Sequence, residues 1–290
     1  MDAIILYGYT PTTCHLARIF SSVGLQVYLF PSEQCSSLSS PYFTLITDPN
    51  DIPYLSSIVI NCQTDLILIK TLINSFPNEY KQRMAYVECS SVFRSNQLEL
   101  FYNEMKFSFY LFMNLIELET STIIQPHFHL ICSGDRIVYD KLLLQRNLPV
   151  KITFLHQTQT PFDAFYLCLL HRYSQAIHLL IYAEMMAILK AANDIYPGNL
   201  QFLFDWSYIK RPLMRQIILQ STSSSFTCTT INDFQLLLEC IIDYFHKKNS
   251  NNTIQNHFQN ITFKLYKLIS NLDINQKQIP LFQLYTLYQS

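Results

Sequence analysis

A turn close to the amino terminus has the spacing of a phosphate-binding loop. Its residues, Gly8-Tyr9-Thr10-Pro11-Thr12-Thr13, stand where a dinucleotide-binding protein carries the pattern G-x-G-x-x-G. The glycines of that pattern permit a tight turn and let the backbone approach a pyrophosphate closely. Only Gly8 is kept here, because Thr10 and Thr13 bring side chains to the other two positions and Pro11 lacks an N–H donor. The spacing therefore predicts the fold of a dinucleotide site, with weak or absent binding of the dinucleotide.

The other candidate cofactor contacts follow two later apolar runs. An acid after the second run would hold the ribose hydroxyls of NAD, and a nearby arginine would hold the 2′-phosphate of NADP. Pro31 and Ser32 occupy that place, with Glu33 as the nearest acid, so the sequence does not choose between NAD and NADP. The candidate cofactor-binding residues are Gly8, Tyr9, Thr10, Pro11, Thr12, Ser32, Cys62 and Gln63.

Short apolar runs alternate with helical segments over residues 1–157, the first predicted domain. In its first helix, Thr12 or Thr13 is the expected cap and Gly24 the expected end. The predicted strands are Ala3–Tyr7, Val27–Phe30, Phe43–Ile46, Ser57–Cys62, Met84–Cys89, Phe107–Phe112, His127–Ser133 and Lys151–Leu155, and the further predicted helices are Leu66–Phe76 and Arg136–Gln145. Strands and helices that alternate at this spacing form a parallel sheet with right-handed crossovers. The predicted fold class is therefore α/β, with a Rossmann-type, NAD(P)-binding-like domain.

The second predicted domain, residues 158–290, is all-helical. From Pro161 to Asp194 the sequence keeps helical periodicity without an internal proline or glycine, which predicts one long helix joining the two domains. Further helices are predicted over 205–220, 232–247 and 258–271. Their faces are too apolar to stay in water, so we expect a homodimer.

Composition limits the classes of partner. The net charge of −1 and the 14% of charged residues give no electrostatic reason to expect nucleic acid or an anionic membrane. The most apolar stretch, residues 176–189, is shorter than the ~20 residues that cross a bilayer. With no signal peptide expected at the start of the chain, we expect a cytoplasmic protein.

Cysteine and glycine usage further limits the kinds of site that the chain is expected to form. The 8 cysteines are scattered without a C-x-x-C pair, which favours reduced, buried thiols over disulfides or a zinc site. The histidines His127, His129, His171 and His178 have no acid or cysteine at ligand spacing, so no metal is predicted. The chain has only 4 glycines, although sites that hold phosphates or carboxylates by backbone N–H groups usually need them.

The order of these pieces resembles the β-hydroxyacid dehydrogenase family, which includes 3-hydroxyisobutyrate and 6-phosphogluconate dehydrogenases and the related imine reductases. The resemblance covers most of the chain. It rests on the Gly8 loop, SSIVINCQTD at 56–65, VECSS at 87–91, HLICSGD at 129–135, AEMMAILKAAN at 183–193 and FKLYKLISNLDINQKQIPLFQLY at 263–285. It implies a Rossmann domain joined by a long helix to a helical domain, through which such proteins commonly pair.

The resemblance also assigns positions to the family's chemistry. The catalytic lysine falls on Tyr166, and a phenol with a pKa near ~10 replaces the ammonium group. Imine reductases carry Asp or Tyr there, so Tyr166 is either a general acid or, as we favour, a packed core residue. Ser90 matches a serine near the nicotinamide, but a serine that ends a strand is equally ordinary. The small-residue substrate loop falls near Phe109–Leu115, and a later lysine falls on Gln259.

Three functions remain open at this point. The first is a degenerate NAD(P)-dependent dehydrogenase-like protein, a pseudoenzyme without ordinary hydroxyacid dehydrogenase activity, which acts as a binding or interaction module for a protein partner. The second is an active NAD(P)H-dependent reductase that uses Tyr166 as its proton donor. The third is a structural subunit of a complex. The altered glycine pattern, the missing lysine and the altered substrate loop favour the first.

Overall fold

The computed structural model describes residues 3–31, 39–90, 95–118, 127–155, 161–174, 176–177, 230–248 and 253–278. They form two compact units, which divide between Cys168 and Leu169. The domain boundary predicted after residue 157 falls within residues 156–160, which lie outside the described residues, so it stays a prediction.

The first unit is built on one eight-stranded sheet. The strands are β1 (Ala3–Tyr7), β2 (Gln26–Phe30), β3 (Thr44–Leu45), β4 (Ile58–Asn61), β5 (Ala85–Glu88), β6 (Phe109–Leu118), β7 (His127–Gly134) and β8 (Lys151–Phe154). Their spatial order is β3-β2-β1-β4-β5-β6-β7-β8. The chain moves outward from β1 to β3 and then returns to place β4 on the other side of β1. A reversal of this kind opens a crevice at the carboxyl ends of β1 and β4.

The predicted α/β fold class is confirmed, with one correction to the predicted parallel sheet. β6 and β7 pair antiparallel, from Leu111 opposite Gly134 to Leu118 opposite His127, whereas the other neighbours are parallel. The reason is the length of the connection. Only residues 119–126 separate the two strands, and a parallel crossover needs a dozen or more residues.

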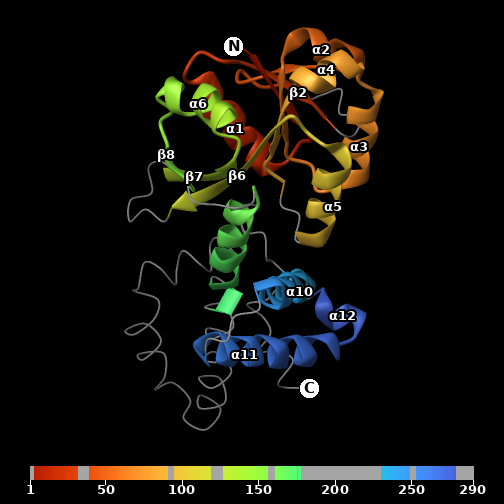
Figure 1. Cartoon of the computed structure of the whole chain (residues 1–290), viewed down its shortest axis with the longest axis vertical. Helices are drawn as coiled ribbons and strands as arrows, with labels where there is room; N and C mark the ends of the chain where they lie inside the picture. Colours follow the sequence, from red (N-terminus) through yellow and green to blue (C-terminus); the bar gives the residue numbers. More distant parts are fainter. Residues whose placement is uncertain are drawn as a thin grey trace, which may run out of the picture. The chain divides into compact units, whose positions relative to one another are not determined.

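Helices cover both faces of the sheet (Figure 1). One face carries α1 (Pro11–Ser21) and α6 (Arg136–Leu142), and the other carries α2 (Ile52–Leu55), α3 (Leu66–Ser75), α4 (Asn78–Arg83) and α5 (Ser95–Met105). Alternate strand residues, such as Ile4, Leu6 and Ile60, pack with Leu16 and Phe20 of α1 in one buried core. α2, α4 and α5 were not predicted from the sequence. The helix predicted to reach Gln145 instead ends at Leu142 and is followed by a 3-10 turn, Leu144–Arg146.

The described part of the second unit is helical. Its elements are α10 (Ile231–Lys248), α11 (Thr253–Ser270) and α12 (Ile274–Lys277). They confirm two predicted helices, although α11 begins before the predicted start at residue 258. The helix predicted over 205–220 and most of the long helix lie outside the described residues, but residues 163–174, 176 and 177 are helical. None of the described helices is both long and apolar enough to cross a membrane.

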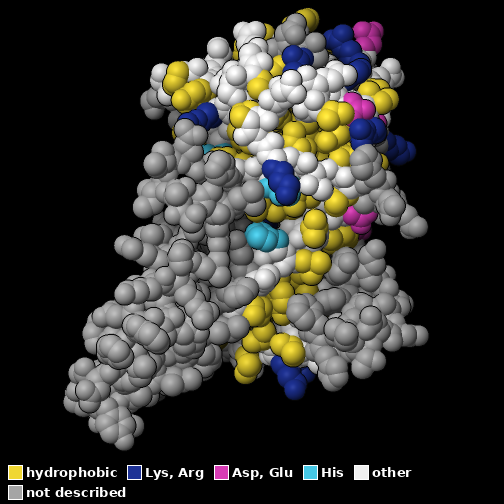
Figure 2. Space-filling view, turned by 90° about the vertical axis from the view of Figure 1, so that its left-hand side faces the viewer, with side chains coloured by type: hydrophobic (Ala, Val, Ile, Leu, Met, Phe, Trp, Pro, Cys, Tyr) yellow, Lys and Arg dark blue, Asp and Glu magenta, His cyan; other side chains and the backbone are white. Residues whose placement is uncertain are grey.

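Figure 2 shows one face of the molecule, on which the Lys, Arg, Asp and Glu side chains of the described residues are dispersed among apolar and uncharged ones.

Candidate functional site

The carboxyl ends of β1 and β4 bring three predicted site residues together. The N–H of Cys62 donates to the carbonyl of Tyr7 at 2.9 Å, which joins the end of β4 to the end of β1. Gly8 has φ +88°, and a Cβ atom there would lie 2.9 Å from Cβ of Gln63. This position therefore needs glycine both for its backbone conformation and for close packing. Gly8, Cys62 and Gln63 are neighbours, as parallel strand ends predict.

The loop after Gly8 is closed by a reciprocal cap between two threonines. The Thr13 N–H donates to Oγ1 of Thr10 at 3.2 Å, and the Thr10 N–H donates to Oγ1 of Thr13 at 3.1 Å. The Thr13 hydroxyl donates to the carbonyl of Gly8 at 2.8 Å. Since its single proton is used there, Thr10 must be the donor in the 3.0 Å contact between the two hydroxyls. Both threonine side chains thus bond each other and the backbone of the turn.

This cap corrects the prediction that Thr12 or Thr13 begins the helix. Thr10 is the N-cap and Pro11 takes the first helical position, where its fixed φ suits a helix and its missing N–H costs nothing. The N–H of Cys14 donates to the carbonyl of Thr10. The Thr12 amide is then the donor that remains at the start of α1, where a dinucleotide site would present several.

Of two further cofactor candidates, Tyr9 is among the described residues and Ser32 is not. Tyr9 is 46% exposed at the edge of the loop. Ser32 lies outside the described residues, so its candidate role at the ribose position stays a prediction.

A buried acid, Glu88, organises the end of β5. It is fully buried and accepts hydrogen bonds from the Tyr86 hydroxyl at 2.7 Å, the Ser90 N–H at 2.8 Å and Nδ2 of Asn61 at 3.1 and 3.2 Å. Asn61 also bonds the backbone of Gln63 through both side-chain atoms. One carboxylate therefore fixes the loops after β4 and β5. Glu88 belongs to the VECSS stretch, but this role was not predicted from the sequence.

Burial determines the acidity of this cluster. It raises the pKa of Glu88, while hydrogen bonds from Ser90, Tyr86 and Asn61 act in the opposite direction. Burial and the nearby Glu88 charge also raise the pKa of Tyr86 and of Tyr110. Ser90, a predicted catalytic candidate, is 3% exposed, and its N–H donates to Glu88. Its hydroxyl has no hydrogen-bond partner among the described residues, so its catalytic role stays a prediction.

Tyr166 lies against α5 within the first unit. Its hydroxyl donates to Oε1 of Glu99 at 2.5 Å, and its ring meets that of Phe165 edge-on at 5.5 Å. The residue is 9% exposed. Tyr166 is thus buried and its hydroxyl bonds a carboxylate, while its assignment as a core residue or a general acid stays a prediction. Sequence reasoning missed Glu99, because it did not predict the helix that carries it.

Most of the described thiols are buried. Cys62, Cys89, Cys132 and Cys168 are each at most 6% exposed and none of them is in a disulfide, whereas Cys14 on α1 is half-buried. A hydrogen bond with Cys62 and burial raise the pKa of Cys89. Within the described ranges, no three His, Cys, Asp or Glu side chains are grouped to hold a metal ion.

Comparison with known proteins identifies the fold. The sequence matches no protein-family model and no curated protein. The 3-hydroxyisobutyrate dehydrogenase of Salmonella typhimurium superposes with a TM-score of 0.66 at 10% identity, over 99% of this chain and 100% of that one. The corresponding enzyme of Mycobacterium tuberculosis gives 0.63 at 9% identity over 100% of both chains. This chain has the β-hydroxyacid dehydrogenase fold. An imine reductase of Myxococcus stipitatus gives 0.50 at 12% identity, over 99% of this chain and 100% of that one.

The substrate loop that the resemblance to the β-hydroxyacid dehydrogenases implies falls on a strand in this chain. The stretch matched to their substrate loop, residues 109–115, lies in β6. Leu111, Phe112 and Met113 have large apolar side chains that are fully buried, and Tyr110 is 4% exposed. A strand in the middle of a sheet has its N–H groups bonded to its neighbours, so this stretch offers no loop of free amides to a substrate carboxylate. Gln259, at the later lysine position, is half-buried on α11.

Proposed function

We propose that this chain is a degenerate relative of the NAD(P)-dependent dehydrogenases, a pseudoenzyme without ordinary hydroxyacid dehydrogenase activity that acts as a binding or interaction module. The observation that carries the proposal is the reciprocal cap between Thr10 and Thr13. Solved proteins of this fold hold NADP+ or NAD+. A working site at the start of α1 would therefore have to hold such a dinucleotide.

The residues at the start of α1 do not fit a tightly held dinucleotide. A pyrophosphate there needs free N–H donors and room for its oxygens. The amides of Thr10 and Thr13 already bond the two hydroxyls, and Pro11 has no donor. An incoming phosphate would have to break the cap, which contributes about 1 kcal/mol of helix stability. Weak or absent binding of NAD and NADP follows.

The catalytic positions support the same conclusion. Hydride transfer to or from a hydroxyacid needs a group that moves the hydroxyl proton and an anchor for the carboxylate. Tyr166 stands in place of the lysine, and its proton is donated to Glu99. Loss of an acid or base alone costs about 10² to 10⁴ in rate, and β6 supplies no carboxylate anchor.

Calorimetric titration of the full chain with NADPH and NADH tests the proposal. We expect no micromolar binding by the wild type. In Thr10→Gly/Thr13→Gly the cap is removed, so binding should become tighter, while Thr12→Gly serves as the matched control and should change little. Micromolar binding by the wild type that the double variant does not improve would overturn the proposal.

The alternative function, an active NAD(P)H-dependent reductase with Tyr166 as proton donor, is tested by turnover. The wild type and Tyr166→Lys are assayed with NADH and NADPH on imines and carbonyls and with NAD and NADP on 3-hydroxyacids. We expect no turnover from either protein, because the loop and the carboxylate anchor are also altered. A wild-type rate of about 1 s⁻¹ or more that Tyr166→Phe abolishes would establish the reductase instead.

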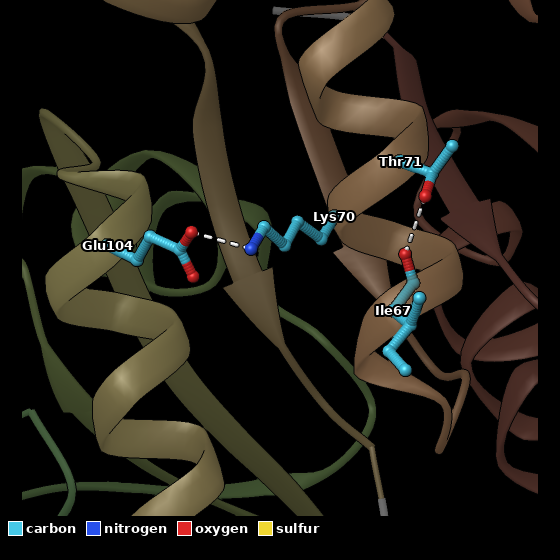
Figure 3. Close-up of polar contacts among 4 residues, drawn as sticks. All are labelled: Ile67, Lys70, Thr71 and Glu104. Carbon is cyan, nitrogen blue, oxygen red and sulfur yellow. Dashed lines mark hydrogen bonds and ion pairs between the residues drawn. The ribbon is translucent and has the colours of Figure 1, made fainter.

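Exposed apolar side chains support an interaction role. Ile67 on α3 is 74% exposed, and Leu100 on the adjacent α5 is 68% exposed. An ion pair joins the two helices (Figure 3). Nζ of Lys70, one turn after Ile67 on α3, contacts Oε1 of Glu104 on α5 at 2.5 Å. This surface is where we expect a protein partner to bind, whether as a regulatory partner or as a neighbouring subunit of a complex.

A homodimer is also part of the proposal. Ile261 and Leu268 are 55% and 67% exposed and lie two turns apart on α11, so they share one stripe of the helix. We expect this apolar stripe to contact a second copy of the chain. We place the protein in the cytoplasm on the composition and the reduced thiols.

A further inference from the structure

A hollow lies at the amino edge of the sheet, the edge opposite to the Gly8 loop. Its floor comes from Ile58, Ala85 and Phe109, the first residues of β4, β5 and β6, which pair directly across the sheet. Ala85 stands between two larger side chains on the same face, so its short side chain leaves a space. The cavity has a volume of about 60 Å³.

Helix α6 closes the side of this hollow. Val138 is 4% exposed and forms part of the wall, whereas Ile137 is 52% exposed and stands at the rim. α6 reaches this edge because β7 runs antiparallel to β6 and ends beside the start of that strand, where Leu111 faces Gly134. The walls are apolar, so a bound molecule has to bring an apolar part.

Two cations line the same cavity, and no acid does. Arg83 is held in place, since its Nη2 donates to the carbonyl of Pro53 at 3.3 Å and its guanidinium lies 5.7 Å from the centre of the Tyr80 ring. Lys141 follows Ile137 by one turn of α6. The neighbouring carboxylate, Asp140, pairs with Arg136. Among the residues that the structure describes, neither Arg83 nor Lys141 has a carboxylate in ion-pair distance.

We propose that this cavity binds a small monocarboxylate with a short branched alkyl chain. By volume, about four to six heavy atoms fill 60 Å³. The alkyl group packs on Ala85 and Val138, and the carboxylate stays at the rim between Arg83 and Lys141. A guanidinium matches a carboxylate in planar, two-point geometry, which favours this anion over a simple halide.

The proposal is independent of the dinucleotide site, and the full chain tests it with isovalerate as the probe. Amide chemical shifts are followed by NMR as isovalerate, its uncharged isostere isovaleramide, or inorganic phosphate is added. We expect saturable shifts of Ala85 and Val138 with isovalerate, and dissociation constants at least several-fold weaker for the other two compounds. Equal binding of isovaleramide would refute the role of the cations, and equal binding of phosphate would refute the role of the apolar walls.

Variants locate the site. Lys141→Met removes the charge at nearly constant length and should weaken isovalerate binding about three- to tenfold. Ile137→Trp, at an exposed rim position, should block the cavity and abolish the shifts. Lys151→Met changes a lysine of the same unit that does not line the cavity and should have no effect. An equal loss in Lys151→Met, or full binding by Ile137→Trp, would overturn the proposal.

Discussion

Glu88 is a charged side chain in a place that water does not reach, so its hydrogen bonds must replace its hydration. Its donors come from β4, from β5 itself and from the Ser90 amide. The sequence predicts the strand that carries Glu88 and the grouping of Gly8 with Cys62 and Gln63. It does not predict that Asn61, far away along the chain, is the partner, because apolar periodicity locates strands but not their polar contacts.

The first prediction concerns Glu88→Gln and pH. The pKa of Glu88 is raised in the folded state, so the folded protein keeps this proton where the unfolded chain has lost it. The stabilisation is fully present below the unfolded pKa and is lost as pH rises through the folded pKa. The wild type should therefore lose stability across this acidic window as pH rises, and Glu88→Gln should lose less.

Denaturant unfolding at a series of pH values measures this effect. Glu88→Gln should also be less stable by about 1–3 kcal/mol at every pH, because an amide places an N–H against groups that are themselves donors. Glu104→Gln, at an exposed ion pair, is the control and should change stability by less than about 1 kcal/mol. Identical pH slopes for the wild type and Glu88→Gln would contradict the prediction.

A second prediction at this scale assigns Tyr166 to the core. Tyr166→Phe removes the hydrogen bond to Glu99 and should lower the free energy of unfolding by about 1–2 kcal/mol. Tyr54→Phe, at a tyrosine that is 88% exposed, should leave it unchanged. Thermal unfolding of both variants provides the measurement, and a Tyr166→Phe protein as stable as the wild type would argue against a structural bond.

At the scale of elements, α1 shows how a loop with the outline of a phosphate site becomes a stable helix start. The spacing from Gly8 to Thr13 predicted the strand, turn and helix correctly. The chemistry of the turn depends on which hydroxyl faces which amide, and the predicted cap, Thr12 or Thr13, was wrong. Pro11 places the cap at Thr10, because a proline at the first helical position makes the residue before it the cap.

The third prediction tests this cap through stability. Thr13→Val keeps the shape of a fully buried side chain but removes the hydroxyl that bonds Gly8 and Thr10. The loss leaves a buried acceptor and donor unpaired, at a cost of about 1–3 kcal/mol. Thr12→Val, at the neighbouring position outside the cap, should cost less than about 0.5 kcal/mol. Equal midpoints of chemical unfolding for the two variants would contradict the role given to the cap.

At the scale of the whole molecule, the alternation of strands and helices was sufficient to predict the α/β class. The direction of β7 was predicted wrongly, because residues in a strand show the same period in either orientation. The predicted strand ended at Phe112, whereas β6 runs to Leu118, and only the connection that then remains, residues 119–126, is too short for a crossover. The short helices α2 and α4 escaped detection because a turn or two of helix carries too little periodicity.

The fourth prediction belongs to this scale and concerns the homodimer. Light scattering at micromolar concentration should give twice the mass of 34.0 kDa. Leu268→Glu places a charge on the exposed stripe of α11 and should yield monomers, whereas Leu100→Glu, at a comparably exposed leucine on α5, should remain dimeric. A monomeric wild type would refute the dimer, and dissociation by Leu100→Glu alone would move the interface to α5.

The antiparallel pairing of β6 with β7 has a kinetic consequence. These strands are joined through a short stretch of chain, whereas β1 must find β4 across half a hundred residues, as the pairing of Ile5 with Val59 shows. Closing the longer loop costs more entropy, and non-local pairings form late. We expect the hairpin to acquire protection from hydrogen exchange first during refolding, with β5 and β8 adding to its two sides. The Gly8 turn, which depends on the contact between β1 and β4, would then be among the last parts of the sheet to form.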